Sequence, residues 1–448
     1  MARSTVLQAV EALLAEGYLV ARRGASTRVA PELPGRPEPS RAAAGPGVAG
    51  VRQRAPRLSR AARSLLAMPQ GAPRLGERPR AFRPGAPALD LFPTALWARI
   101  AARCHARASA AQLDYGPSAG LQSLRTAIAA HVSAARGVRC SAEQVFVTAG
   151  TQQAFDQTAR LVLDPGDEAW LEEPGYLGAR AALLSAGARI VPVPVDAQGL
   201  DVSRGIQRAP AARLIALAPS HHYPLGVTLS LPRRLLLLRH AARARAVILE
   251  DDYDSEFRHG GRPLMALQGL DERGCVVYVG TFSKSLFPGL RLGFLIAPPP
   301  LVDAFAAART GGPASTLDQA ALARFISEGH FATHVRRMRA AYRERSEALL
   351  SALEADCGGA LVPRPCETGL QLSATLVGAL DDRRVRDEAA ARGVEVSALS
   401  AYSLGKAKAA GLLLGFGGVR PQAMRAGTQK LAQAIEAARR PLAGSRRH

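Results

Sequence analysis

The chain has 448 residues, of which 48% are hydrophobic and 21% are charged, and its formal net charge is +21. This length allows a large buried core and more than one domain, and no run of 18 apolar residues predicts a membrane helix. The first 30 residues lack a signal-peptide pattern, so we expect a cytoplasmic protein with no membrane partner. The five cysteines include no CxxC pair, and we therefore expect neither a disulfide framework nor a metal site.

The positive charge is concentrated near the N-terminus. Residues 1–83 hold 15 arginines and five glutamates, a net charge of +10 from under a fifth of the chain. Such a segment is typical of a surface that contacts a polyanion such as DNA. The alternative is a drift toward arginine throughout, because only four of the 58 basic residues are lysines. The lysines that remain are Lys284, Lys406, Lys408 and Lys430.

Hydrophobic periodicity predicts three parts in chain order. Residues 1–30 contain a helix, with apolar positions on one face over 4–16, and then two short strands around a turn. Residues 31–80 are rich in Pro, Gly, Ala and Arg, which indicates a linker. From 81 to 448, strands alternate with helices, first as βαβ units over about 110–320 and then as a smaller α+β subdomain over about 321–448.

Two strand ends carry groups that suit one cofactor. The stretch "YVGTFSKS" places Lys284 after an apolar strand, and "VILEDDYDSEF" ends another strand in Asp251 and Tyr253. Groups at the carboxyl ends of parallel strands converge on the crevice where α/β sheets bind ligands. A lysine to form a Schiff base, a carboxylate for the protonated ring nitrogen and a phenol for the ring oxygen are what pyridoxal 5′-phosphate (PLP) requires.

A phosphate site is predicted beside these groups. Phosphate binding needs backbone amides at a helix N-terminus together with hydroxyl and guanidinium groups. The stretch "TAGTQQAF" turns from strand to helix at Gly150, Thr151 and Gln152. The groups that complete the site lie close to the lysine in sequence: Thr281, Ser283 and Arg291.

Each residue also has a purely structural alternative. A lysine at a strand end is often a solvated surface residue, and an arginine often pairs with a nearby acid. The acidic run "EDDYDSE" suits calcium only with glycine in sixth place, where, counting from Asp252, it has Phe257. The order of the residues, in a chain that otherwise avoids lysine, favours the PLP site.

From about residue 82 to its end the chain resembles fold-type I PLP-dependent transferases of the aminotransferase superfamily. The stretches "EEPGY", "SHHYPLG", "EDDYDSEF" and "GTFSKSLFPGLRLGF" are similar to those of the MocR-type subgroup of GntR-family regulators. In that subgroup a winged helix-turn-helix precedes an aminotransferase-like domain. The resemblance implies an α/β fold, with a mostly parallel central sheet in a large domain and a smaller α+β C-terminal domain. It also implies bound PLP and a homodimer.

The resemblance assigns roles to single residues. It implies that Lys284 forms the Schiff base, that Asp251 pairs with the pyridinium nitrogen and that Tyr253 lies near the ring oxygen. Tyr176 of "EEPGY" matches the aromatic residue that stacks on the cofactor ring, with core packing as its alternative. Tyr223 stands where aminotransferases commonly have the asparagine of "NPTG".

A second departure concerns substrate binding. The strand within "AGLLLGFGGVR" carries no arginine to grip a substrate carboxylate, and Arg420 comes only after it. A carboxylate buried without a guanidinium is costly to bind, which argues against an amino-acid effector and efficient transamination. His221 and His222 are candidate proton carriers, or loop histidines satisfied by the backbone.

By the same resemblance, residues 1–30 are the second half of a GntR-type winged helix-turn-helix. The alternative is a helix and hairpin packed against the enzyme-like domain. The first two helices are absent, so we expect either a start upstream of Met1 or a truncated copy, with a loosely folded remnant and impaired DNA binding. The predicted DNA-contacting residues are Arg3, Ser4, Thr5, Arg22 and Arg23.

The leading functional hypothesis is a PLP-binding transcription regulator whose aminotransferase-like domain senses PLP or an amine effector and controls DNA binding. The alternative is a PLP-dependent aminotransferase that acts on an amino acid. The basic N-terminal region and the two departures favour the regulator, with weak transaminase activity still possible.

Overall fold

The computed structural model describes residues 3–22, 24, 26–31, 57–69, 80–258, 264–308, 315–364, 367–405 and 410–440. The chain divides into two compact units, Met1–Arg57 and Leu58–His448. Within the described ranges, no helix is long and apolar enough to cross a membrane. Four residues considered above lie outside these ranges: Arg23, Cys366, Lys406 and Lys408.

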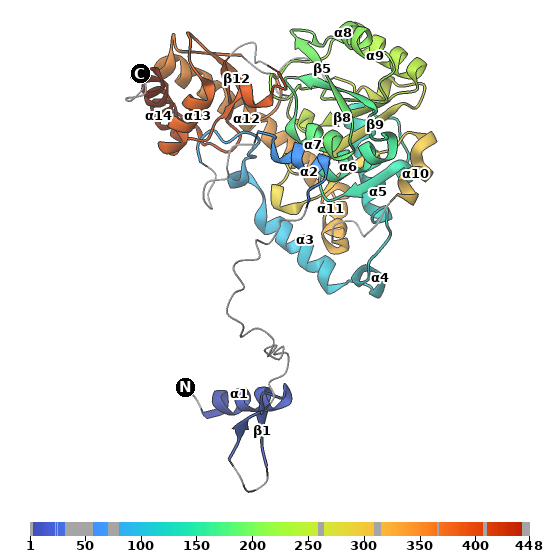
Figure 1. Ribbon diagram of the computed structural model, residues 1–448, viewed down its shortest axis with the longest axis vertical. Helices are drawn as coiled ribbons and strands as arrows, with labels where there is room; N and C mark the ends of the chain where they lie inside the picture. Colours follow the sequence, from blue (N-terminus) through green and yellow to red (C-terminus); the bar gives the residue numbers. More distant parts are fainter. Residues whose placement is uncertain are drawn as a thin grey trace, which may run out of the picture. The chain divides into compact units, whose positions relative to one another are not determined.

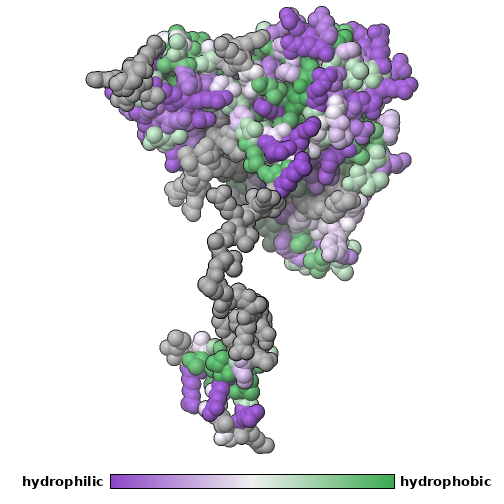
Figure 2. Space-filling view, viewed as in Figure 1, coloured by the Kyte–Doolittle hydropathy of each residue, from purple (hydrophilic) through white to green (hydrophobic). Residues whose placement is uncertain are grey.

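The N-terminal unit contains one helix and one short hairpin. Helix α1 (Arg3–Ala15) is followed by strands β1 (Leu19–Val20) and β2 (Arg28–Val29), which pair antiparallel. Helix α1 buries none of its residues, and Val6 and Leu7 are 50% and 54% exposed. Figure 2 shows hydrophobic side chains at the surface of this unit. An amphipathic helix without a covered face draws little stability from packing.

The larger unit contains a mixed eight-stranded sheet, visible in Figure 1. Its order is β3-β10-β9-β8-β7-β4-β5-β6, and the five strands from β9 to β5 run parallel to one another. Strand β10 runs antiparallel to both neighbours, and β6 runs antiparallel to β5. The strands are β3 (Val145–Thr148), β4 (Glu168–Glu173), β5 (Arg189–Asp196), β6 (Gly199–Leu200), β7 (Leu214–Leu217), β8 (Val247–Asp252), β9 (Val276–Thr281) and β10 (Gly293–Ile296).

Helices cover both faces of this sheet. Along β4, Ala169 and Leu171 pack into one apolar cluster and Trp170 into another, as the two-residue period of a strand requires. The first cluster includes residues of α6, α7 and α10, and the second includes residues of α8 and α9. These helices are α6 (Thr151–Val162), α7 (Leu177–Ser185), α8 (Val202–Arg208), α9 (Leu231–Ala244) and α10 (Val302–Ala307). A parallel sheet buried on both faces is the expected α/β architecture.

The C-terminal part forms a smaller α+β layer. An antiparallel sheet of order β11-β12-β14-β13 packs with long helices around a further apolar cluster. Its strands are β11 (Leu361–Pro363), β12 (Gln371–Leu376), β13 (Ser397–Ala398) and β14 (Gly411–Gly415). The other α-helices between residues 80 and 440 are α3 (Thr94–Ala106), α4 (Ala110–Leu113), α5 (Gln122–Arg136), α11 (Thr316–Ser327), α12 (His330–Cys357), α13 (Asp382–Ala391) and α14 (Pro421–Arg439). The expected fold class is confirmed.

The predicted linker contains a helix. Helix α2 (Arg60–Leu66) begins at Ser59, whose side chain accepts a hydrogen bond from the amide of Ala62, and it packs against α7. Serine at this position satisfies an amide that the first helical turn leaves unpaired. The high proline and glycine content of the surrounding sequence hid this short element.

Residues 80–88 connect the small sheet to the large domain. Ala81 and Phe82 accept backbone hydrogen bonds from Glu395 and Gly415, and Phe82 is fully buried. Arg83 forms an ion pair with Glu395, with 2.5 Å between Nε and Oε2. The segment is therefore part of the small subdomain in space, although the sequence separates them by some 300 residues.

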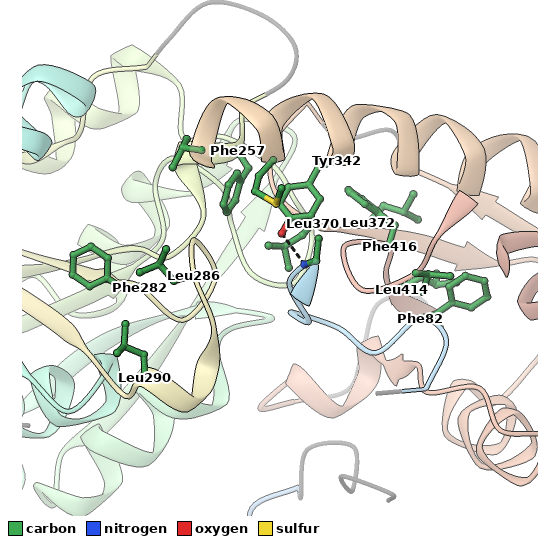
Figure 3. Close-up of a cluster of buried hydrophobic side chains, with 14 of the residues drawn as sticks. Phe82, Phe257, Phe282, Leu286, Leu290, Tyr342, Leu370, Leu372, Leu414 and Phe416 are labelled. Atoms are coloured by element: carbon green, nitrogen blue, oxygen red, sulfur yellow. Dashed lines mark hydrogen bonds between the residues drawn. The ribbon is translucent and has the colours of Figure 1, made fainter. Parts of the chain in front are cut away.

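Tyr342 on α12 anchors the end of this segment. Its hydroxyl accepts a hydrogen bond of 3.0 Å from the amide of Ala88, and its ring meets Phe257 edge-on at 4.8 Å (Figure 3). Both Tyr342 and Ala88 are buried, so water does not compete for the amide. The hydrogen bond joins helix α12 to the segment 80–88, and the ring contact joins the same helix to the loop after β8.

We predict that Tyr342→Phe lowers the free energy of unfolding by about 1–3 kcal/mol, because it leaves a buried amide unpaired. Urea denaturation followed by circular dichroism measures this loss. The matched control is Tyr115→Phe, since Tyr115 is 89% exposed in the single chain and the substitution keeps its ring. Equal stability of both variants would show that the Ala88 amide finds another partner.

Candidate cofactor site

The candidate site lies at the carboxyl ends of β8 and β9. Strand β8 carries apolar residues up to Leu249 and then continues into acidic ones, while β9 is buried along its whole length up to Thr281. The two strands are parallel neighbours, so Asp251 and the loop that holds Lys284 leave the sheet at the same edge. This edge is where doubly wound sheets bind ligands.

Two of the acidic side chains at this strand end have structural partners. The Asp252 carboxylate accepts from Arg136 Nε at 2.8 Å and from the Tyr278 hydroxyl at 2.7 Å. Burial raises the pKa of Asp252, but Arg136 and the hydrogen bonds outweigh it and hold that pKa below its ordinary value. The Glu250 carboxylate accepts from the amides of Leu267 and Gln268, each at 2.8 Å.

Asp251 differs from its neighbours. Its Oδ1 is buried and has no hydrogen-bond partner among the described residues. The Oδ1 atom of Asp252 is also unpartnered, but the other oxygen of that carboxylate is paired with Arg136. Burial and the negative charges of Asp252 and Asp254 raise the pKa of Asp251 to about 8, while Lys284 acts to lower it. A buried carboxylate oxygen without a donor needs one, and a protonated pyridine nitrogen is a suitable donor.

Lys284 is held by an element that the sequence did not indicate. Its Nζ donates to the carbonyl oxygen of Gly85 at 2.9 Å. Gly85 has φ +70°, and a Cβ on it would lie 2.6 Å from Nζ, so only glycine allows this approach. The sequence does mark a turn at Gly85, by the "PG" pair in "FRPGAP". It does not indicate that this turn contacts Lys284.

The predicted phosphate groups gather at the start of α6. Gly150 caps this twelve-residue helix, and the Arg291 guanidinium carbon lies 4.0 Å from where a Cβ of Gly150 would be. The amide of Ser283 donates to Thr281 Oγ1 at 3.1 Å, which closes a tight turn before Lys284. Helix-terminal amides facing a guanidinium suit a phosphate.

Gln152 and Thr151 follow Gly150 in the first helical turn. The side-chain amide of Gln152 donates to Gly178 O and to Asp156 Oδ1, each at 3.1 Å. The side chain is thus engaged within the protein, and only the backbone amide of Gln152 is available to a phosphate.

Aromatic rings form one wall of the crevice. The Tyr176 ring lies 5.5 Å from that of Tyr223, and the Tyr223 ring lies 5.9 Å from that of Tyr253. The Tyr223 hydroxyl shares a hydrogen bond of 3.0 Å with Tyr402 of the small subdomain. Burial raises the pKa of Tyr176 to about 12, so its hydroxyl is neutral at physiological pH. Sequence reasoning did not find Tyr402, because nothing in "SALSAYSLG" marks it as a site residue.

The two neighbouring histidines differ in their contacts. His222 Nε2 lies 3.0 Å from the Pro174 carbonyl and its Nδ1 accepts from the Leu225 amide at 3.2 Å. Burial lowers the pKa of His222 to about 3, so this ring is neutral and satisfied by the backbone. His221 instead contacts two side chains, Asp254 and Tyr253.

The small subdomain presents no guanidinium from β14. The strand is leucine-rich and fully buried. Arg420, which follows it, pairs with Asp90 at 3.2 Å, and Asp90 also pairs with Arg345 at 2.9 Å. Arg420 therefore forms an ion pair at the surface of this unit and does not take the place of an arginine on β14.

The predicted DNA-contacting residues lie in the N-terminal unit. Arg3, Ser4 and Thr5 form the first turn of α1, and all three are exposed. Arg22 follows β1 and is also exposed. Elsewhere, in the part of the chain that the structure describes, no group of three His, Cys, Asp or Glu side chains is placed to hold a metal ion.

The residues present fit PLP. Lys284 would form the Schiff base, Asp251 would pair with the ring nitrogen, and the amides of α6 with Arg291 would hold the phosphate. Bound there, PLP would act as an electron sink for an amine attached to it. The unpaired Oδ1 of Asp251 is the observation in this structure that asks for such a partner.

The fold and these groups define an aminotransferase-like domain, and residues 85–376 match the family of class I and II aminotransferases. PLP is the cofactor of this class. The solved α-aminoadipate aminotransferase LysN of Thermus thermophilus, in complex with N-(5′-phosphopyridoxyl)-L-leucine, has a TM-score of 0.72 and 28% identity over 85% of this chain and 95% of its own.

Full-length similarity is to regulators. The chain is 43% identical over 438 residues to a probable rhizopine catabolism regulatory protein MocR of Rhizobium meliloti, which covers 97% of this chain and 86% of the relative. It is 31% identical to the pyridoxine biosynthesis regulator PdxR of Corynebacterium glutamicum, over 93% of this chain and 84% of that one. The chain belongs to the MocR-type family of transcription regulators, which carry an aminotransferase-like domain.

We predict that Asp251→Asn lowers affinity for PLP about 10–100-fold, because it removes the charge partner of the ring nitrogen. The fold should be unaffected, since Asp251 Oδ1 bonds to no described protein group. The matched control is Asp252→Asn, which should instead destabilise the protein by about 3–5 kcal/mol because it leaves the buried Arg136 charge uncompensated. Spectroscopic titration with PLP measures the first effect and urea denaturation the second. The reverse result would make Asp252 the cofactor ligand and Asp251 the structural residue.

Proposed function

We propose that this protein is a transcription regulator whose aminotransferase-like domain binds PLP through Lys284 and senses PLP or an amine effector. The observation that carries the proposal is the placement of Lys284 and Asp251 at the ends of two neighbouring parallel strands, where a buried oxygen of Asp251 has no partner among the described residues. Similarity to a MocR regulator over nearly the whole chain supports a regulatory role.

The crevice favours an amine over an amino acid. A substrate carboxylate needs a guanidinium, and β14 presents only leucines between its two glycines. Transamination, the alternative function, is supported by the same lysine and aspartate, and a 2-aminoadipate transaminase of Thermus thermophilus is 35% identical over 63% of this chain and 71% of its own. The missing arginine would make turnover of amino acids slow.

We expect borohydride reduction of the PLP-loaded protein, followed by peptide mapping, to place the pyridoxyl label on Lys284. The variant Lys284→Ala should lose the visible absorbance of the Schiff base. Lys430→Ala is the matched control, because Lys430 lies on the exposed face of α14. A label on another lysine would overturn the proposal.

We also propose a cytoplasmic homodimer. The exposed side chains of Leu113 and Tyr115, 68% and 89% exposed, support an apolar contact between copies near α4. Light scattering at micromolar concentration should give a mass near twice 47.1 kDa. A monomer that retains PLP would contradict the dimer and leave the cofactor site intact.

DNA is the proposed macromolecular partner, through Arg3, Ser4, Thr5, Arg22 and Arg23. Specific readout requires a recognition helix held in fixed register, and α1 buries none of its residues. We therefore predict weak binding with little preference for a promoter over a scrambled duplex. Affinity should fall steeply with salt, because phosphate contacts release counterions.

Gel-shift titrations at two salt concentrations test this prediction. Arg22→Ala should reduce the slope of log K against log[salt] by about 1. Arg99→Ala, a substitution of an exposed arginine on α3, is the control and should leave the slope unchanged. Tight, salt-tolerant and promoter-selective binding would contradict the prediction. It would show that α1 can read DNA sequence without packing one of its faces against other elements.

A further inference from the structure

A buried histidine–aspartate pair lies behind Tyr253. His221 Nδ1 lies 2.8 and 3.0 Å from the two carboxylate oxygens of Asp254, and 3.1 Å from the Tyr253 hydroxyl. The side chains of His221 and Asp254 are 3% and 0% exposed. The His221 and Tyr253 rings stack at 5.7 Å with an angle of 23°. Water is thus excluded, and the three groups must satisfy one another.

The number of hydrogens in this cluster determines which of its atoms donate and which accept. A carboxylate only accepts, so the single hydrogen on Nδ1 of His221 is donated to Asp254. Nδ1 then has no lone pair to receive the Tyr253 proton. The Tyr253 oxygen can share the N–H only as a second acceptor.

The other nitrogen of His221 supports this tautomer. Nε2 is buried, and no described group is within hydrogen-bond reach of it. A hydrogen on Nε2 would have no acceptor there, whereas one on Nδ1 has the Asp254 carboxylate. The titratable groups that face His221 are Asp254 and Tyr253, from the loop after β8, and its chain neighbour His222.

The Tyr253 hydroxyl keeps its proton and has one direction in which to donate it. Burial raises the pKa of Tyr253 well above its ordinary value, and the Asp254 charge acts in the same direction. A side-chain hydrogen bond with Gln371 on β12 acts to lower this pKa, but burial outweighs it. With the Nδ1 hydrogen of His221 directed at its oxygen, the phenol cannot donate to that ring, and its own hydrogen is available to an acceptor in the crevice.

We propose that His221, locked in one tautomer by Asp254, is a positioning residue that directs the Tyr253 hydroxyl to donate its hydrogen to the ring oxygen of bound PLP. The inference rests on the proposed PLP site. Such a donor withdraws charge from the ring oxygen, which then holds the neighbouring imine proton less tightly. His221 and Asp254 thereby lower the pH at which the cofactor changes its visible absorbance.

The small subdomain closes over this pair. Gly369 has φ +87°, and a Cβ on it would lie 2.3 Å from Asp254 Oδ2 and 2.6 Å from His221 Cε1. Any larger residue would push the pair apart, so glycine is required at this contact. The geometry of the pair therefore depends on the position of the segment that precedes β12.

The test is a pH titration of the visible absorbance of the PLP-loaded full chain, with PLP affinity as a second readout. Tyr253→Phe removes the donor and should raise the midpoint by about 0.5–1 pH unit. Asp254→Asn, a neutral isostere, unlocks the tautomer and should move the midpoint in the same direction. His221→Asn keeps an N–H near the Nδ1 position and should restore the midpoint of the unmodified chain. His105→Asn, on the exposed face of α3, is the control for an unrelated histidine.

The outcomes separate this inference from the proposed function. Unmoved midpoints in Tyr253→Phe or in Asp254→Asn, with a normal Lys284-dependent absorbance, overturn the inference alone. A midpoint in His221→Asn that shifts as far as that of Asp254→Asn also overturns it, because a donor at the Nδ1 position would then have no effect. An unmodified chain without any Lys284-dependent absorbance overturns the proposed function and this inference with it. Circular dichroism and unfolding midpoints confirm that each variant folds.

Discussion

The burial of several carboxylates at the end of β8 is the constraint on which the site depends. Carboxylates so close together repel one another and lose hydration, so each needs its own compensation. Asp252 has Arg136, Glu250 has two backbone amides, and Asp254 has His221. Asp251 has no such compensation among the described residues, because Lys284 acts on its pKa only as a charge and no described group donates to its Oδ1. Asp251 is thus the carboxylate of these four for which no described group compensates by a hydrogen bond to the buried oxygen, at the strand end where a ligand would bind.

This arrangement also explains why the neighbours of Asp251 are structural. Arg136 reaches Asp252 from α5 and also bonds to Ser220 Oγ at 2.9 Å, which ties the loop before His221 to the same ion pair. The loop that carries His221 and the loop that carries Asp254 are therefore both held by Arg136, through Ser220 and Asp252. A ligand that binds to Asp251 meets a preorganised wall and pays little to order it.

Much of this could be predicted from the sequence, because strand patterns and short motifs report on local structure. The alternation of apolar runs and helices gave the α/β class, and the spacing of Lys284, Asp251 and Tyr253 gave the cofactor. Contacts between distant segments could not be predicted. Gly85 reaches Lys284, and Tyr402 reaches Tyr223, across 199 and 179 residues, with no local pattern to mark either pair. The helix α2 was missed because its Ser59 cap lies in a proline-rich background. The domain boundaries and the roles of single site residues remain predictions.

The contacts made by these missed residues suggest how a cofactor site can serve regulation. Gly85 belongs to the segment that pairs with the small sheet, Tyr402 and Gly369 belong to the small subdomain, and all three touch residues of the crevice wall. A change at Lys284 that breaks its hydrogen bond to Gly85 therefore acts on a strand of chain anchored by Phe82 and Arg83 in the small subdomain. A ligand shifts a conformational equilibrium only through differential contacts with two states, and the proposed Schiff base would change one such contact, the hydrogen bond from Lys284 to Gly85. An enzyme needs a site that excludes water during turnover. A regulator needs only that these contacts between the subdomains differ between the amine-free and the amine-bound protein.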